Sequence, residues 1–145
     1  MLSTFSRRAV GVAAALAAAT GALALAAPAA SAAPSAGACH TQLVTAGIKV
    51  SQSAYAAEFG VEQGPFEHHD FVYTDLASAR ATLGGTACVG IEVVQAEVAL
   101  ALVKIDEGEA ALRADDWAGS ADALGVADDA LRSASYKAWR LTHPN

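Results

Sequence analysis

The fold is decided by residues 91–114, which read IEVVQAEVALALVKIDEGEAALRA. Apolar residues in this stretch recur every three or four positions, which is the spacing of one face of an α-helix. Val93, Leu100 and Val103 fall on its partly polar side. We therefore predict a central helix over residues 86–114 that packs on two neighbours. Its apolar face spans about 100° of the helical wheel and carries Ile91, Val94, Val98, Leu102, Ile105 and Leu112.

Three further segments have the same helical spacing, and residues typical of turns separate them. Gly60 can close the first helix, Asp70 can cap the second, and Asp115 and Asp116 can open the last. No strand-like alternation of apolar and polar residues runs beyond four positions. The sequence predicts an all-α protein, a small four-helix bundle in up-down-up-down order. The predicted helices cover residues 39–59, 70–83, 86–114 and 116–141.

The last predicted helix carries three large aromatic residues, Trp117, Tyr136 and Trp139. Trp139 lies about 40° from Trp117 on the helical wheel, so both can face inward. We predict that these residues are core anchors. If one of them were exposed, it would mark a surface for a partner.

The first 32 residues have the three parts of an export signal. Two arginines precede an apolar stretch over residues 9–26, and Ala30-Ser31-Ala32 is a cleavage site of the A-x-A type. We predict a cleaved signal peptide over residues 1–32 and a secreted mature chain of one helical domain, residues 33–145. The sequence leaves open whether the secretory or the twin-arginine route exports it.

Cys39 and Cys88 are the only cysteines in the chain. Two cysteines in an exported protein predict one disulfide, because compartments outside the cytoplasm are oxidising. The bond would join the starts of the first and third predicted helices and place them at the same end of the bundle. The spacing is not that of a C-x-x-C redox pair, so we predict a structural role.

Charge and composition exclude several classes of function. Without the signal, 7 Lys and Arg stand against 15 Asp and Glu, a net charge of −8, which disfavours nucleic acid and anionic lipid as partners. Alanine accounts for 38 of the 145 residues, a usage that suggests a high-GC bacterium such as an actinobacterium. After residue 33 no apolar run is long enough for a transmembrane segment.

Residues 55–73 concentrate the side chains best suited to a binding site. This segment holds five of the eight aromatic residues of the predicted mature chain, and two adjacent histidines. Aromatic residues between helices also commonly fold back to cover the open end of a bundle. The candidate ligand-binding residues are Tyr55, Phe59, Phe66, His68, His69, Phe71 and Tyr73.

Metal or haem binding by the same segment is one alternative. His68 and His69 could bind a transition metal together with Glu62 or Glu67, and the aromatic residues could flank a haem. The chain has no H-E-x-x-H motif, no Glu-x-x-His pair and no D-x-D-x-D calcium loop. The main prediction therefore includes no cofactor and no metal site.

Residues 69–73 read HDFVY, which resembles the His-Asp-Phe-Gly-Tyr stretch of small secreted prokaryotic phospholipases A2. The resemblance implies that His69 is a general base that activates water and that Asp70 helps to bind Ca²⁺. A hydrolase of this kind, with His69 and Asp70 as its catalytic pair, is the second alternative.

The chain departs from the phospholipase pattern at two positions. Phe66 stands where that family has a cysteine, and Gly90 stands where it has the aspartate that orients the imidazole, with Glu92 as the nearest carboxylate. A base without an orienting acid has no control of its tautomer. We therefore expect a secreted, non-catalytic binding or envelope-associated protein whose partner is a protein or a small apolar ligand.

Overall fold

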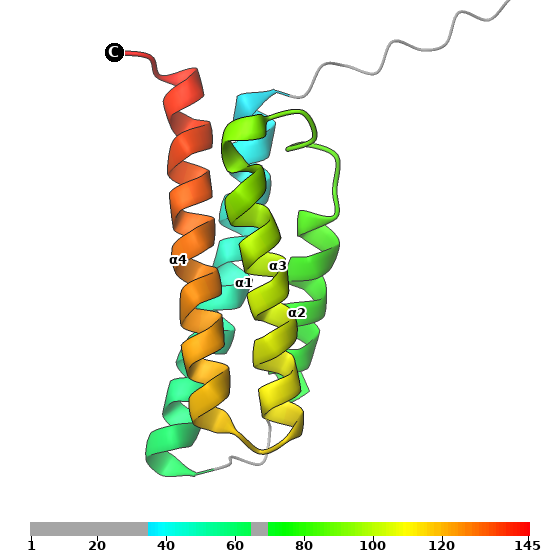
Figure 1. Cartoon of the computed structure of the whole chain (residues 1–145), viewed down its shortest axis with the longest axis vertical. Helices are drawn as coiled ribbons and strands as arrows, with labels where there is room; N and C mark the ends of the chain where they lie inside the picture. Colours follow the sequence, from blue (N-terminus) through cyan, green and yellow to red (C-terminus); the bar gives the residue numbers. More distant parts are fainter. Residues whose placement is uncertain (1–34, 65–69) are drawn as a thin grey trace, which may run out of the picture. The chain divides into compact units, whose positions relative to one another are not determined.

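The computed structural model describes residues 35–64 and 70–145, which contain four α-helices and no β-strand. Figure 1 shows the chain reversing direction at each connection, so that consecutive helices run antiparallel. The predicted all-helical fold with four helices is confirmed. The predicted signal peptide lies outside the described residues. The helices are α1 (Ala36–Gln63), α2 (Asp70–Leu83), α3 (Glu92–Arg113) and α4 (Trp117–Thr142).

Helix α4 has the most extensive packing of the four helices. It lies along both α1 and α3, whereas α2 packs mainly on α1 and contacts α3 much less. The central position predicted for the third helix thus belongs to α4. Helix α3 packs on two neighbours, as predicted, but Val93, Leu100 and Val103 on its partly polar side are exposed and do not form the second contact. Because α2 docks mainly on α1, it leaves that face of α3 open.

Small residues allow the helices to approach closely. Alanines fill many of the fully buried positions between larger aliphatic side chains. A Cβ on Gly108 of α3 would lie 2.7 Å from Cγ of Leu124, and a Cβ on Gly60 of α1 would overlap the indole ring of Trp117. At these two glycines, side chains of α4 lie directly against the backbones of α3 and α1.

Helix α1 continues beyond Gly60, which the sequence predicted would end it. Gly60 is buried and helical, and its lack of a side chain makes room for Trp117. The helix instead ends at Gly64, whose φ of 81° lies in the left-handed region that glycine adopts readily. The observed helix is longer than the predicted one at both ends. At its C-terminal end, a tertiary contact overrides the local preference of Gly60.

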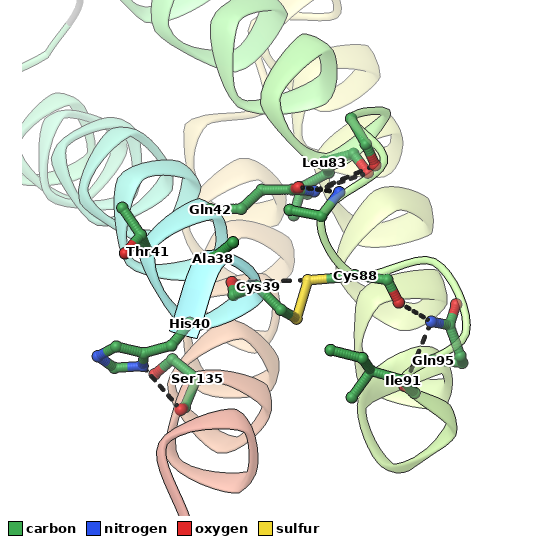
Figure 2. Close-up of a disulfide and its surroundings, with 12 residues drawn as sticks. Ala38, Cys39, His40, Thr41, Gln42, Leu83, Cys88, Ile91, Gln95 and Ser135 are labelled. Atoms are coloured by element: carbon green, nitrogen blue, oxygen red, sulfur yellow. Dashed lines mark hydrogen bonds between the residues drawn. A yellow bond between two sulfur atoms is a disulfide. The ribbon is translucent and has the colours of Figure 1, made fainter. Parts of the chain in front are cut away.

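Helix α3 begins at Glu92, later than the predicted residue 86. The segment 84–91 forms turns and a bend, and it holds Cys88. The predicted disulfide is present: Cys88 is bonded to Cys39 in the first turn of α1 (Figure 2). The bond therefore joins α1 to the segment that precedes α3 and not to the helix itself.

The side chain of Gln42 supports this turn segment. Its Nε2 donates hydrogen bonds of 3.4 Å to the backbone carbonyls of Leu83 and Gly85, and its Oε1 accepts one of 3.1 Å from the backbone N–H of Ala87 (Figure 2). The Gln42 side chain thus forms hydrogen bonds with backbone groups of the turn segment, which would be paired with each other if that segment were helical.

Helix α4 begins as predicted, with Asp116 as its N-cap, and the side chain of Asp116 accepts a hydrogen bond of 2.9 Å from the backbone N–H of Gly119. Trp117 is buried, as predicted, but Tyr136 and Trp139 are exposed, so their predicted place in the core is wrong. Tyr136 stacks on Trp139 with ring centroids 6.1 Å apart, and Trp139 stacks on His143 at 4.4 Å. These rings pack along the surface of α4 and not into the core.

Candidate ligand-binding groove

A groove lies between α1 and α2, with a volume of about 530 Å³. Three of the candidate binding residues, Tyr55, Phe59 and Phe71, line it. The structure therefore brings together aromatic side chains from two helices that the sequence separates by an interhelical connection. The other lining residues are Gln52, Ala56 and Asp75.

The groove is a consequence of how the two helices face the core. Tyr55 and Phe59 lie one turn apart, on the same side of α1. Phe71 lies in the first turn of α2, and Val72 directly after it is fully buried. Because successive helical residues point about 100° apart, burial of Val72 turns Phe71 toward the groove.

The three aromatic side chains are substantially exposed. Tyr55 is 71% exposed, Phe59 43% and Phe71 45%. Single apolar residues on a surface are common, but aromatic residues gathered around one concave site are typical of sites for ligands or partners. The groove thus offers mainly apolar contact area to a bound molecule.

The exposed apolar face of α1 continues beyond the groove. Val44 and Ile48 are exposed on the same side of the helix. They line a second hollow of about 340 Å³ between α1 and α4, and Gln52 lines both hollows. At the α4 side of this second hollow, Arg132 is paired with Asp128 at 2.6 Å. Helix α1 therefore has one side in the core and another available for binding.

Besides the hydroxyl of Tyr55, two polar side chains, Asp75 and Gln52, line the groove between α1 and α2. Asp75 accepts a hydrogen bond of 2.8 Å from Nζ of Lys49, so its negative charge is balanced by a neighbouring cation. The side-chain amide of Gln52 makes no hydrogen bond to any of the described residues, and it can donate and accept at the rim. The groove therefore combines an apolar wall with neutral hydrogen-bonding groups on Gln52 and Tyr55.

The remaining predicted site residues do not line this groove. Tyr73 packs against the core, with the guanidinium of Arg113 5.2 Å from its ring centroid. Asp70 is exposed at the first position of α2. Phe66, His68 and His69 lie outside the described residues.

Next to Tyr73, Glu109 of α3 joins the two helices by ion pairs. It binds Arg80 of α2 and, at 2.5 Å, Arg113 of its own helix. Partial burial acts to raise the pKa of the Glu109 carboxyl, but the hydrogen bonds from Arg113 and Arg80 outweigh it and hold the pKa below its ordinary value. Glu109 is therefore ionised at neutral pH and helps to hold α2 against α3.

Asp70 and Glu92, the carboxylates at or near the positions that the phospholipase resemblance assigns to calcium binding and to orienting the histidine, are far apart. Asp70 is the first residue of α2, and Glu92 is the first residue of α3. These two helices run in opposite directions, so their first residues lie at opposite ends of the helical assembly (Figure 1). Helix α2 alone is about 21 Å long at 1.5 Å per residue. Glu92 therefore does not lie beside Asp70.

Clusters of metal ligands are absent from the described part of the chain. Within residues 35–64 and 70–145, no three His, Cys, Asp or Glu side chains come close enough to hold a metal ion. Glu62, a candidate ligand in the metal alternative, is exposed near the end of α1.

Sequence reasoning missed Gln52, Ala56 and Asp75 as groove residues. A signal for Gln52 was present, because the exposed side of α1 forms a second stripe at helical spacing, whereas Ala56 is buried and lies outside that stripe. The position of Asp75 depends on how α2 docks on α1, which the spacing within either helix does not specify. The exposed stripe consists of Val44, Ile48, Gln52, Tyr55 and Phe59.

Fold and site together define an all-helical, disulfide-linked protein with an apolar groove. Comparison of the chain with protein-family models, curated proteins and solved structures finds no match. None of the helices in the described ranges combines the length and apolar character needed to cross a membrane.

Proposed function

We propose that this protein is a non-catalytic binding protein that holds a small apolar ligand in the groove between α1 and α2. The observation that carries the proposal is the grouping of Tyr55, Phe59 and Phe71, all exposed, around one cavity of about 530 Å³. Sites of this volume with mainly apolar walls are typical of small-molecule binding.

The polar groups of the groove favour a neutral ligand. The Asp75 carboxylate is already balanced by Lys49, so it leaves no net charge to attract an ion. The predicted mature chain has a net charge of −8, which disfavours anions further. Gln52 can bind a hydroxyl, ester or amide group at the rim. An apolar chain or ring with one neutral polar group fits these features.

We also propose that the protein is exported and acts outside the cytoplasm. The Cys39–Cys88 disulfide supports this location, because such bonds persist in oxidising compartments. Mass spectrometry of the intact protein from the culture medium tests it. We expect the mass of residues 33–145 less two hydrogens, and recovery of the uncleaved chain only from the cytoplasm would contradict the proposal.

Displacement of a fluorescent probe tests ligand binding. N-phenyl-1-naphthylamine is neutral and apolar, and its fluorescence should rise and saturate as the oxidised protein is added. Dodecan-1-ol should displace it at a lower concentration than dodecanoate does. Absence of saturable binding, or preference for the carboxylate, would contradict the proposal.

Matched variants locate the probe. Phe71→Ala removes one groove wall and should weaken binding roughly tenfold, the loss expected for about 1.4 kcal/mol of apolar contact. Leu100→Ala on α3 is the control, because Leu100 is as exposed as Phe59 but lies outside the groove. Equal binding by both variants would place the probe elsewhere on the protein.

A protein partner is the second candidate, favoured by the extension of the apolar face of α1 to Val44 and Ile48. Ile48→Ser distinguishes the two, because Ile48 does not line the groove of the small-ligand proposal. Probe binding should be unchanged in this variant if the groove alone is the site. A complex isolated with the natural protein and lost in Ile48→Ser would instead favour a protein partner that covers the whole face.

A further inference from the structure

A second surface lies where α3 begins and α4 ends, and it shares no residue with the groove between α1 and α2. Two shallow hollows adjoin there, of about 450 and 390 Å³. Val93 of α3 and Leu141 of α4 line both of them, so the hollows form one continuous face. We call it the Val93–Leu141 face.

The centre of this face is apolar and open. Val93 is 49% exposed, Leu141 52% and Tyr136, which lines the first hollow, 59%. Tyr136 stacks on Trp139, and this enlarges the apolar surface next to the first hollow. Valine, leucine and tyrosine side chains gathered in this way are typical of the centre of an interface between proteins.

Two charged residues without ion pairs flank this centre. Arg140 is the one Lys or Arg of the described residues that forms no ion pair there; the other six each bind a carboxylate. Arg140 lines only the first hollow. Glu92 is exposed, lines only the second hollow, and likewise has no ion pair with a described residue. One positive and one negative group thus lie on either side of Val93 and Leu141.

We propose that the Val93–Leu141 face binds a second copy of this chain in a two-fold symmetric dimer. A two-fold axis through the apolar centre sets Val93 and Leu141 against the same residues of the second copy. When the axis runs perpendicular to the line from Arg140 to Glu92, it also exchanges these two sides of the face, so Arg140 meets Glu92 of the partner subunit and the reverse pair forms as well. A face that complements itself in this way meets the requirement of an isologous contact.

The other charge near the face is already neutralised. Lys137, which lines the first hollow, is paired with Glu97 of α3. Arg140 is therefore the cation on this face that a partner can pair with. A partner without a carboxylate next to its apolar centre would leave Arg140 unpaired. A second copy supplies both features from Glu92, Val93 and Leu141.

Analytical ultracentrifugation of the oxidised protein tests the dimer. Over concentrations up to about 1 mM, which cover the affinities of small transient interfaces, the average mass should rise toward twice that of the chain. Arg140→Glu and Glu92→Arg should each weaken association about tenfold or more, by placing like charges opposite one another. The double variant Arg140→Glu/Glu92→Arg should restore it.

The double variant distinguishes a role of Arg140 and Glu92 in the dimer interface from a role within their own helices. Arg140 in the last turn of α4 and Glu92 in the first turn of α3 also suit the dipoles of their own helices. If that were their only role, each reversal would lower thermal stability without changing the average mass. Asp129→Arg, a reversal at an exposed position of α4 outside the face, is the control and should leave association unchanged. A monomer at every concentration, or a double variant that fails to restore the dimer, would overturn the proposal.

Discussion

Gly60 of α1 lies against the indole ring of Trp117, the first residue of α4, and a Cβ on Gly60 would overlap that ring. Trp117 is buried there although it lies near the end of its helix. The contact explains how the core accommodates its largest side chain, and it explains why a glycine occurs inside α1.

Gly60→Ala should therefore destabilise the protein, although alanine is the better helix former. The added methyl group overlaps the Trp117 ring, and overpacking of this kind costs about 1–3 kcal/mol. Gly125→Ala is the control, because a Cβ at Gly125 of α4 meets no atom within 4 Å. It should stabilise the protein by about 0.5–1 kcal/mol. Urea denaturation measures both changes, and equal effects of the two substitutions would contradict the packing described here.

The Cys39–Cys88 disulfide should contribute a large share of the stability. It closes a loop of 49 residues, for which the chain-entropy model gives about 4 kcal/mol. Reduction should lower the denaturation midpoint accordingly. In the Cys39→Ala/Cys88→Ala variant, reductant should have no effect on the midpoint, and a shift there would show that the reductant acts by another route.

The ion pairs of Glu109 predict a loss of stability in acid. The pKa of Glu109 is lower in the folded protein than in the unfolded chain, so its contribution is complete above the ordinary glutamate pKa of about 4.3. It is lost as the pH falls from there through the lower folded pKa. Thermal unfolding between pH 7 and pH 2 should show this decline.

Glu109→Gln should be less stable than the natural protein at pH 7 and should lose less stability in acid. Glu107→Gln is a suitable control, because Glu107 is more exposed and pairs only with Lys104 of the same helix. If both variants follow the acid dependence of the natural protein, the attachment of α2 to α3 does not depend on Glu109.

The helices could be predicted because apolar spacing is a local signal, and the disulfide could be predicted because two cysteines permit only one pairing. Apolar spacing placed all four helices, and two cysteines allowed one bond. The C-terminal end of α1 and the start of α3 could not be placed, because they depend on contacts between distant residues. Trp117 keeps Gly60 helical, and Gln42 holds the turns before α3.

The candidate site was predictable only in part for the same reason. Tyr55 and Phe59 share one side of α1 by their spacing alone, but Phe71 joins them through the docking of α2. Tyr73, only two residues from Phe71, faces the core and Arg113 instead. The helical wheel also did not predict that Tyr136 and Trp139 are exposed. A wheel gives the direction of each side chain, but it does not show how far the neighbouring helices extend alongside it.

The most direct test of the binding proposal is an NMR titration of the oxidised protein with dodecan-1-ol, recorded on its aromatic ¹H–¹³C resonances. We predict saturable shifts for Tyr55, Phe59 and Phe71, which line the groove, and none for Tyr136 on α4. Saturation without shifts at the three groove residues, or no response at any aromatic residue, would contradict the assignment of this groove as the ligand site.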